Sequence, residues 1–381
     1  MSDFPPEILF DILSRLPPKD LIRFLCVSKA WNALIRHHRF IEAHLQRSIQ
    51  TNSFRTILLE SEDGSRPSNF FSSAFDDSET FGPVVKIEQP LKCPDDYTEI
   101  LGCSINGVVC VHNGMRKNLA LWNPSIQKFK KIPLPTFEIE RRRSSFSAIP
   151  EYGFGYDSAN HDYKILAIVN FDRTDDASVP VSSQVSMYSL KFNSWKRIPK
   201  LPCDGFYVQT GIVVFLNGAM SCLVRKSDSY KNRCKIVSLD LASEKYMEFG
   251  TPVGDEDDNF MMSLKVLGGS LCICVHEFWP KCDIWIMKEY GVTKSWTLLF
   301  PFENGGMAYS NRYCKPLVFS KEGEMVVLVN VERTTVFRCD LKKKRAKQVR
   351  ICGLPTSFNG TICVGSLSLL DGDLMTVGRQ Q

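Results

Sequence analysis

The chain has 381 residues, of which 44% are hydrophobic and 23% are charged, and its formal net charge is +5. This is the composition of a folded globular protein that is long enough for two domains or one large one. The excess of 47 basic over 42 acidic residues is too small to predict nucleic-acid binding. No apolar run approaches the length of a membrane span, so neither nucleic acid nor a membrane is expected as a partner.

The cysteines and histidines do not predict a metal or cofactor site. The sequence has 14 cysteines, most of them single residues within apolar runs, and no two are spaced as Cys-x-x-Cys. The six histidines are scattered, so no zinc-binding spacing emerges. Buried, reduced thiols are typical of cytoplasmic or nuclear proteins, and we expect one or both of these locations.

Residues 4–35, FPPEILFDILSRLPPKDLIRFLCVSKAWNALI, have apolar residues at helical spacing. Pro6 suits the first position of a helix, and Pro17 ends that helix while Pro18 can begin the next one. Ser28 can cap a third helix that carries Trp31. The pattern therefore predicts a small all-α unit of three short helices at the N-terminus.

Three short helices bury too little apolar surface to be stable on their own, and they carry more apolar side chains than they can cover. The surplus could pack on the rest of the chain, or it could form a docking surface for another protein. The residues alone leave these two interpretations about equally favoured.

The same stretch resembles an F-box, whose family pattern is approximately L-P-x-E-I-L-x-x-I-L-x-R-L-P-x-K-x-L-x-R-F-x-x-V-S-K-x-W. Phe4 stands where the family usually has Leu. The resemblance implies an F-box domain at residues 1–48 that binds the Skp-type adaptor of a cullin–RING ubiquitin ligase. The residues expected to contact the adaptor are Pro5, Ile8, Leu9, Ile12, Leu13, Leu16, Pro17, Leu21, Val27 and Trp31.

Beyond residue 50 the helical spacing gives way to short β-branched and aromatic runs that alternate with turns. An apolar run, a tight turn and a second apolar run recur six times. These turns lie at Asn106–Gly107, Asn160, Asn217–Gly218, Gly268–Gly269, Glu322–Gly323 and Asn359–Gly360. Asn-Gly and Gly-Gly supply the positive φ that two-residue hairpins require, so each copy predicts a β-hairpin.

A second hairpin follows each of the first five copies. Aligning these places five residues at one position, at intervals of 66, 51, 50 and 50 residues: Phe129, Trp195, Tyr246, Trp296 and Ala346. Two hairpins in a repeat of about fifty residues are typical of a four-stranded propeller blade. The regular recurrence of the aromatic residues favours packing between blades over a ligand-binding box.

The sixth blade lacks a second hairpin, and residues 53–60 and 83–90 can supply the missing strands. We therefore predict an all-β propeller of six blades over residues 51–381, closed by strands from both ends of the chain. Seven blades remain the alternative, if residues 51–90 and the C-terminal tail form separate blades.

The segments NGVVCV, LWNPS, GFGYD and DYKIL resemble the F-box-associated domain of plant F-box proteins, a kelch-like propeller. That family includes the S-locus F-box proteins and those that restrain immune receptors, and the resemblance spans about residues 100–300. It implies a non-catalytic substrate receptor of a Skp–cullin–F-box ubiquitin ligase, with the cullin and RING subunits reached through the adaptor and an unidentified protein as target. The alternatives are an adaptor-bound scaffold outside a ligase and, with little support, an enzyme built on the propeller.

Other motifs do not predict chemistry. GFGYDS at 153–158 lacks the third glycine of a dinucleotide loop, and no helical pattern follows it. DEDDN at 255–259 lacks the glycine and the distant glutamate of a calcium loop. KKKRAK at 342–347 resembles a nuclear localisation run but also fits an exposed turn. We therefore assign no catalytic residue.

The long segments of the repeat fall between successive hairpins, on positions that lie on one face of a propeller. Long loops with charges of both signs and aromatic anchors suit protein recognition, although they could simply be unconstrained. The residues expected to contact the target are Arg141, Arg142, Arg143, Phe171, Tyr230, Asp257, Phe260, Phe278, Trp279 and Tyr309.

Overall fold

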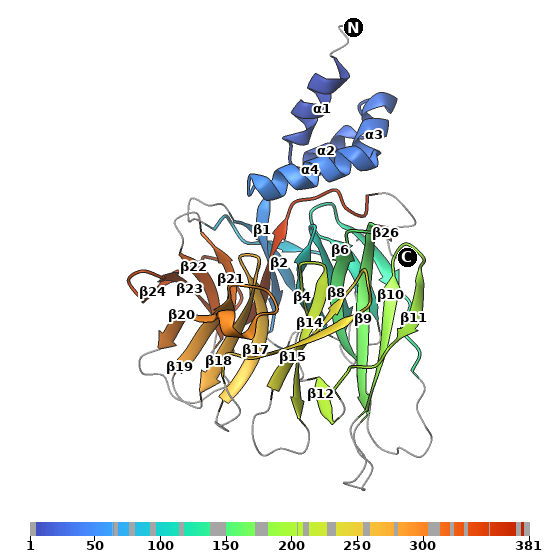
Figure 1. Ribbon diagram of the computed structural model, residues 1–381. Helices are drawn as coiled ribbons and strands as arrows, with labels where there is room; N and C mark the ends of the chain where they lie inside the picture. The colour runs from blue at the N-terminus through green and yellow to red at the C-terminus, as the bar shows by residue number, and fades with distance from the viewer. Residues whose placement is uncertain are drawn as a thin grey trace. The chain divides into compact units, whose positions relative to one another are not determined.

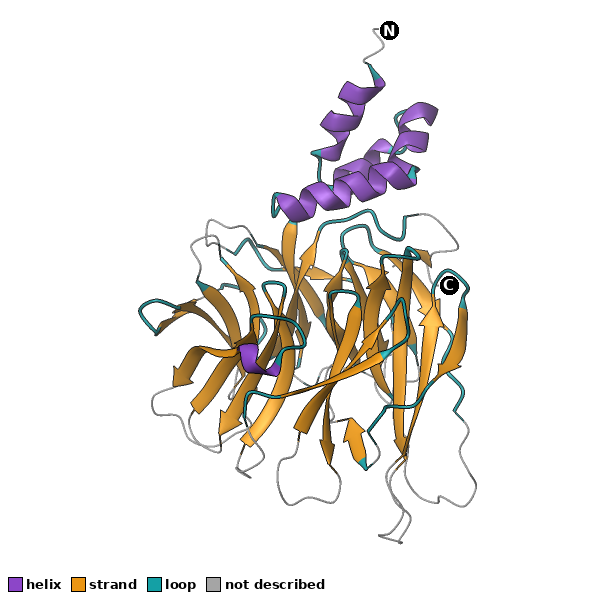
Figure 2. Ribbon diagram, in the orientation of Figure 1, coloured by secondary structure: helices purple, strands orange, loops and turns teal. Residues whose placement is uncertain are grey.

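The computed structural model describes most of the chain. The described residues are 5–62, 64, 68–75, 81–91, 97–113, 118–137, 150–171, 182–203, 205–208, 213–226, 234–253, 260–277, 281–303, 313–320, 324–330, 334–349, 351–370 and 375–376. By its internal contacts the chain divides into two compact units, one of residues 1–132 with 351–381 and one of residues 133–350. Figure 2 shows helices in the N-terminal part of the described chain, from Pro6 to Gln50, and mainly strands in the rest.

The first unit begins with four helices (Figure 1), which are the three predicted in residues 4–35 and a fourth that follows them. Their bounds are α1 (Pro6–Ser14), α2 (Pro18–Phe24), α3 (Lys29–Arg36) and α4 (His38–Gln50). The Ser28 hydroxyl accepts a hydrogen bond from the Trp31 amide at 3.1 Å, which caps α3 as expected. The fourth helix escaped prediction because two of its buried residues, His44 and Ser48, are polar and interrupt the apolar period.

Two blades complete the first unit, with strand orders β25-β1-β2-β3 and β26-β7-β6-β5-β4. Their strands are β1 (Arg55–Ser61), β2 (Phe70–Ala74), β3 (Val85–Ile87), β4 (Thr98–Ile105), β5 (Val108–Asn113), β6 (Leu119–Asn123), β7 (Lys128–Ile132), β25 (Phe358–Val364) and β26 (Met375–Thr376). The first of these blades joins one strand from near the C-terminus to three from the N-terminal side. The predicted closure by strands from both chain ends is thereby confirmed.

The predicted hairpin at Asn359–Gly360 is wrong, because both residues lie inside the single strand β25. They pair with Glu60 and Leu59 of β1, and neither adopts a positive φ, whereas Asn106 and Gly107 have φ of 52° and 76°. An Asn-Gly pair permits a tight turn but does not impose one, and pairing with β1 keeps this segment extended.

The second unit contains four blades. Their strands are β8 (Glu151–Asp157), β9 (Asp162–Phe171), β10 (Ser182–Ser189), β11 (Ser194–Ile198), β12 (Phe206–Val208), β13 (Val214–Leu216), β14 (Ala219–Lys226), β15 (Cys234–Asp240), β16 (Tyr246–Gly250), β17 (Phe260–Leu267), β18 (Ser270–Glu277), β19 (Lys281–Met287), β20 (Trp296–Glu303), β21 (Tyr313–Phe319), β22 (Met325–Asn330), β23 (Thr334–Asp340) and β24 (Arg345–Val349), with a short 3₁₀ helix, η2 (Thr293–Ser295). Together with the first unit these sheets make a six-bladed β-propeller of four-stranded blades, as predicted. The additions to the regular pattern are β26 at the edge of β7 and the use of both β12 and β13 beside β14.

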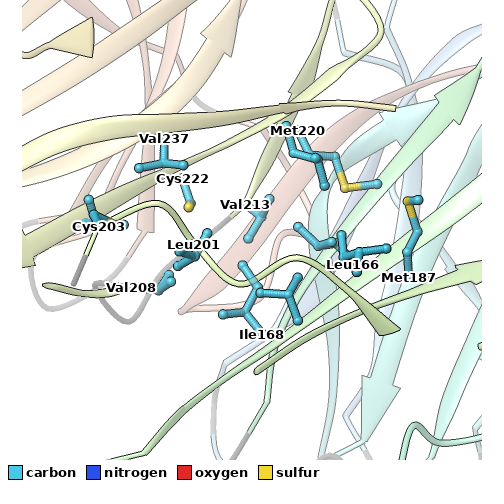
Figure 3. Close-up of a cluster of buried hydrophobic side chains, with 14 of the residues drawn as sticks. Leu166, Ile168, Met187, Leu201, Cys203, Val208, Val213, Met220, Cys222 and Val237 are labelled. Carbon is cyan, nitrogen blue, oxygen red and sulfur yellow. The ribbon is translucent and has the colours of Figure 1, made fainter. Parts of the chain in front are cut away.

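Apolar side chains fill the space between neighbouring blades. Figure 3 shows one such core, in which Leu166 and Ile168 of β9 lie close to Val213 and to Met220 of β14. All four of these side chains are at most 2% exposed. Burial of this kind supplies most of the stability of a propeller, because each blade is too thin to have a core of its own.

Three of the recurring aromatic residues also donate hydrogen bonds to backbone carbonyls of the preceding repeat. Each of these carbonyls lies at the end of the outermost strand of that repeat or directly after it. The Trp195 indole donates to the Pro133 carbonyl at 2.6 Å. The Tyr246 hydroxyl donates to the Pro199 carbonyl at 2.8 Å, and the Trp296 indole donates to the Gly250 carbonyl at 3.0 Å. The repeated position therefore links successive repeats, which confirms the predicted packing role.

Candidate functional site

The four N-terminal helices share one core with a segment from the other end of the chain. Leu13, Leu21, Ile35 and Phe40 are completely buried in a cluster that also contains Ile126, Leu367 and Leu370. Figure 1 shows the C-terminal segment after β25, in red, running beneath α4. Part of the apolar surplus of the helices is therefore covered by the chain itself.

Leu13 and Leu21 are consequently not available to a partner. Both are 0% exposed, so their expected role as adaptor contacts is wrong. They lie on the inner faces of α1 and α2. Leucines that form a core and leucines that form a docking surface recur with the same helical spacing, so the sequence does not show which of them are buried. Their contribution is to hold the helices together.

Three other apolar side chains of the expected set remain at the surface. Ile8 is 48% exposed, Ile12 is 47% exposed and Val27 is 56% exposed. Ile8 and Ile12 lie one turn apart on α1, and Val27 lies between α2 and α3. We call these three residues the exposed apolar set.

The remaining expected adaptor contacts lie between these extremes. Pro5 is exposed, while Leu9, Leu16, Pro17 and Trp31 are half-buried. Trp31 packs edge-to-face on Phe24 with ring centroids 5.5 Å apart. These residues can present part of their surface to a partner while stabilising the helices.

Polar contacts fix α4 against α1. The Arg47 guanidinium donates to Asp11 Oδ1 at 2.9 Å, and Arg15 donates to Asp11 Oδ2 at 2.7 Å. These two hydrogen bonds, that of Arg47 above all, hold the pKa of the Asp11 carboxyl below its usual range. The carboxylate therefore bridges two helices of the unit.

His44 of α4 contacts the turn that follows α1 from inside the unit. Its Nε2 lies 2.9 Å from the Leu16 carbonyl oxygen, and its ring stacks on Phe54 with centroids 6.0 Å apart. Burial lowers the pKa of His44, opposed by the hydrogen bond to Leu16. The neutral imidazole is thus the form that this site favours at neutral pH.

Most of the expected target-binding residues lie outside the described part of the chain. They are Arg141, Arg142, Arg143, Tyr230, Asp257, Phe278, Trp279 and Tyr309. Phe171 ends β9, but its side chain is also outside the described part. The expected binding face of the propeller therefore stays a prediction.

Phe260 is described, and its expected role as an exposed anchor is wrong. It is only 7% exposed and packs in a core with Met262 and Val275. Phe260 begins the strand β17 and pairs with Glu277, so it belongs to the sheet and not to the preceding loop.

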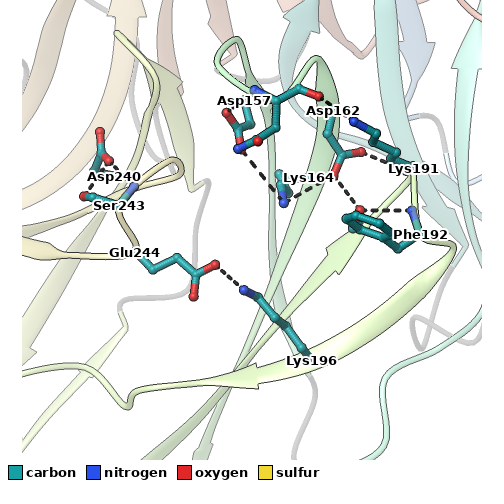
Figure 4. Close-up of polar contacts among 11 residues, drawn as sticks. Asp157, Asp162, Lys164, Lys191, Phe192, Lys196, Asp240, Ser243 and Glu244 are labelled. Atoms are coloured by element: carbon teal, nitrogen blue, oxygen red, sulfur yellow. Dashed lines mark hydrogen bonds and ion pairs between the residues drawn. The ribbon is translucent and has the colours of Figure 1, made fainter.

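The GFGYDS segment is part of a blade, as predicted. It forms β8 and the turn to β9, where the buried Lys164 ammonium lies 3.2 Å from Asp162 and 4.0 Å from Asp157 (Figure 4). Asp162 also accepts hydrogen bonds from the Ser189 hydroxyl and the Lys191 amide. Buried charges that are fully partnered in this way fix a turn, which leaves no loop for a phosphate.

The described residues show neither a metal-ligand group nor a membrane-spanning helix. Among them, no group of three His, Cys, Asp or Glu side chains could hold a metal ion. None of the helices in the described ranges has the length and apolar character needed to cross a bilayer. The KKKRAK run spans the turn from β23 to β24 and the first residues of β24, and in the turn the Asp340 carboxylate accepts hydrogen bonds from the amides of Lys342 and Lys343. The acidic DEDDN segment lies outside the described residues.

A helical unit with an exposed apolar set, joined to a six-bladed propeller, defines an F-box protein with a β-propeller domain. The F-box domain family matches residues 1–42, and the family described as the F-box associated beta propeller domain matches residues 65–364. The chain belongs to this family of F-box proteins with an associated β-propeller.

The sequence is similar to F-box proteins over most of its length. The chain is 31% identical to the F-box protein CPR1 of Arabidopsis thaliana, over 99% of this chain and 92% of that protein. It is 28% identical to an F-box/kelch-repeat protein of Arabidopsis thaliana, over 78% of this chain and 79% of that protein. Among solved structures, TolB from Acinetobacter baumannii has a TM-score of 0.47 at 11% identity, covering 86% of this chain and 73% of TolB.

Proposed function

We propose that this protein is the substrate-recognition subunit of a Skp–cullin–F-box ubiquitin ligase. The observation that carries the proposal is the exposed apolar set, Ile8, Ile12 and Val27, which stays at the surface of a helical unit whose Leu13 and Leu21 are completely buried. Apolar side chains that remain half-exposed after a unit has formed its core are suited to a protein interface. Family membership supports a Skp-type adaptor as the partner.

The propeller would bind the target protein, and the adaptor would connect the chain to the cullin and RING subunits. The chain itself would form no covalent bond with the target. Its contribution would be to hold a target lysine at high effective concentration near the charged conjugating enzyme. Such a receptor would work in the cytoplasm, the nucleus or both.

The test is adaptor binding by the full chain carrying Ile8→Ala and Ile12→Ala together. Anchors at an interface typically contribute about 1–3 kcal/mol each, so the double variant should bind the adaptor at least about tenfold more weakly in calorimetry. Ile49→Ala is the matched control, because Ile49 is 43% exposed on α4 and outside the expected contact set.

Thermal unfolding of each variant separates lost contact from lost folding. The double variant should unfold within a few degrees of the unchanged protein, because both side chains are half-exposed in the free chain. Equal affinity of the double variant and the Ile49→Ala control would contradict the assignment of the adaptor surface. The ligase role would be contradicted if the chain bound the adaptor but the purified complex of the two failed to recruit the cullin in a reconstitution.

A further inference from the structure

The strand β11 forms the outer edge of its blade in the second unit. The strand order of this sheet is β11-β10-β9-β8, and within the described part of the chain no strand pairs with the other side of β11. Of its five residues only Ile198 is buried. An edge strand offers a row of backbone N–H and C=O groups to a further strand, so an extended segment can add to the sheet here.

The charge along this edge is positive throughout. Residues 190–200 contain no acidic side chain and four exposed basic ones, which are Lys191, Lys196, Arg197 and Lys200. Lys196 points toward the next blade, where it forms an ion pair with Glu244. Successive residues of a strand point to opposite faces, so Lys196 and Arg197 lie on the two faces of β11. Consecutive acidic residues on an added strand would therefore each meet a positive charge.

Phe192, in the turn that leads into β11, is an exposed aromatic anchor. Its side chain is 72% exposed. The turn is held by the Phe192 amide, which donates to Ser189 Oγ at 3.2 Å, and by the Ser189 hydroxyl, which donates to the buried Asp162 (Figure 4). The Tyr188 hydroxyl also donates to Asn193 Oδ1 at 2.6 Å. Because these bonds already fix the turn, little conformational entropy is lost when the ring meets a partner.

A hollow lies at the other end of β11. The strand ends at Ile198, whereas the neighbouring β10 continues to Ser182 and pairs there with β9. The hollow has a volume of about 480 Å³, and its lining includes Gln184, Arg197 and Lys200. A carboxylate placed in it would lie near two positive side chains, which form the stronger, charge-assisted kind of hydrogen bond.

We propose that β11, together with Phe192 and this hollow, is a docking edge for an extended acidic segment of a partner protein. The segment adds as a further strand beside β11. Its carboxylates pair with Lys196 and Arg197, and an apolar side chain at one end packs on Phe192. The proposal does not rest on the ligase role.

Two simpler explanations account for less of this surface. Lysine on an edge strand can serve only to prevent aggregation, but that role requires neither an exposed aromatic ring nor a hollow. A second copy of the chain would bring two β11 strands together and set like charges opposite each other, which is destabilising. An acidic segment fits the charge, the ring and the hollow together.

Fluorescence anisotropy with the full chain tests the proposal. The probe is a fluorescein-labelled peptide of valines around a central pair of glutamates, about eight residues long so that it can follow β11 at roughly 3.3 Å per residue. A second peptide has glutamine in place of glutamate. A third keeps the glutamates but is methylated on alternate backbone nitrogens, so that it cannot donate hydrogen bonds to the sheet. We expect the second and third peptides to bind at least about tenfold more weakly than the first.

Three variants locate the binding surface. Phe192→Ala and Arg197→Glu should each weaken binding of the acidic peptide at least about tenfold. Arg345→Glu is the matched control, because Arg345 is exposed on another outer strand, β24, and the change of charge is the same. It should alter the affinity by no more than about twofold. All three side chains are exposed, so thermal unfolding should show that each variant is folded.

Several results would overturn the proposal. Failure of the acidic peptide to bind at about millimolar concentration would remove the docking edge. Equal binding of the glutamine or the methylated peptide would exclude pairing of an acidic strand. An equal loss in Arg345→Glu and Arg197→Glu would show a general attraction to a basic chain. A dimer in sedimentation that dissociates in Phe192→Ala would identify a second copy of the chain as the occupant.

Discussion

Leu367→Ala should loosen the N-terminal helices although Leu367 lies more than 300 residues further along the chain. Leu367 is 0% exposed and shares its core with Leu13, Leu21 and Phe40. The segment that carries it is anchored by Asn123, whose Nδ2 donates to the Ser366 and Ser368 carbonyls at 3.0 and 2.8 Å. The helices therefore pack against a C-terminal segment that these hydrogen bonds hold in place.

The magnitude follows from the atoms removed. Truncation of leucine to alanine removes three carbon groups at about 0.8 kcal/mol each, and the remaining cavity raises the typical total to about 3 kcal/mol. The free energy needed to separate the helices from the C-terminal segment should fall by up to that amount. This corresponds to about a hundredfold loss of protection from hydrogen exchange in α1 and α2.

The assay is hydrogen exchange of the full chain, read by mass spectrometry in the peptides that cover residues 5–50. Leu271→Ala is the matched control, because Leu271 is 1% exposed in a core of the second unit. It should leave exchange in the helices unchanged. If Leu367→Ala alters helix protection no more than Leu271→Ala does, the shared core does not stabilise the F-box and this reasoning is refuted.

Two further predictions concern the stability of the fold. Gly107→Ala and Gly218→Ala each place a side chain at a positive φ, +76° and +77° respectively, which costs about 1–2 kcal/mol of stability. At Gly107 the new Cβ would also lie 2.4 Å from the Val364 carbonyl oxygen, whereas at Gly218 no atom lies within 4 Å of it. Denaturant unfolding should therefore show a clearly larger loss for Gly107→Ala, and equal losses would contradict the close approach. His44 has a lowered folded pKa, so the unfolded chain binds its proton first, and the stabilisation from neutral His44 should be lost as the pH falls below about 6.5. The unfolding temperature of His44→Gln should consequently fall less between pH 7 and pH 5 than that of the unchanged protein, and parallel curves would exclude His44 as a source of acid sensitivity.

Features that depend on short stretches of chain were predictable from the sequence. Pro6, Pro18 and Ser28 set the starts of three helices because proline geometry and capping act within a few residues. The fifty-residue spacing of Trp195, Tyr246 and Trp296 revealed the blades, because each repeat solves the same packing problem with the same kind of side chain. The structure added their backbone hydrogen bonds, which the spacing alone does not specify.

The tertiary structure decided which side chains are covered and which distant residues meet. Leu13 and Ile12 are adjacent and similarly apolar, yet one is buried and the other half-exposed, because a core includes only the helix face that its neighbours reach. Asn359–Gly360 is a turn by sequence and a strand in the fold, because pairing with β1 satisfies its backbone in an extended form. Cys274 and Cys314 are forty residues apart, and only the stacking of one blade on the next brings them into one buried core.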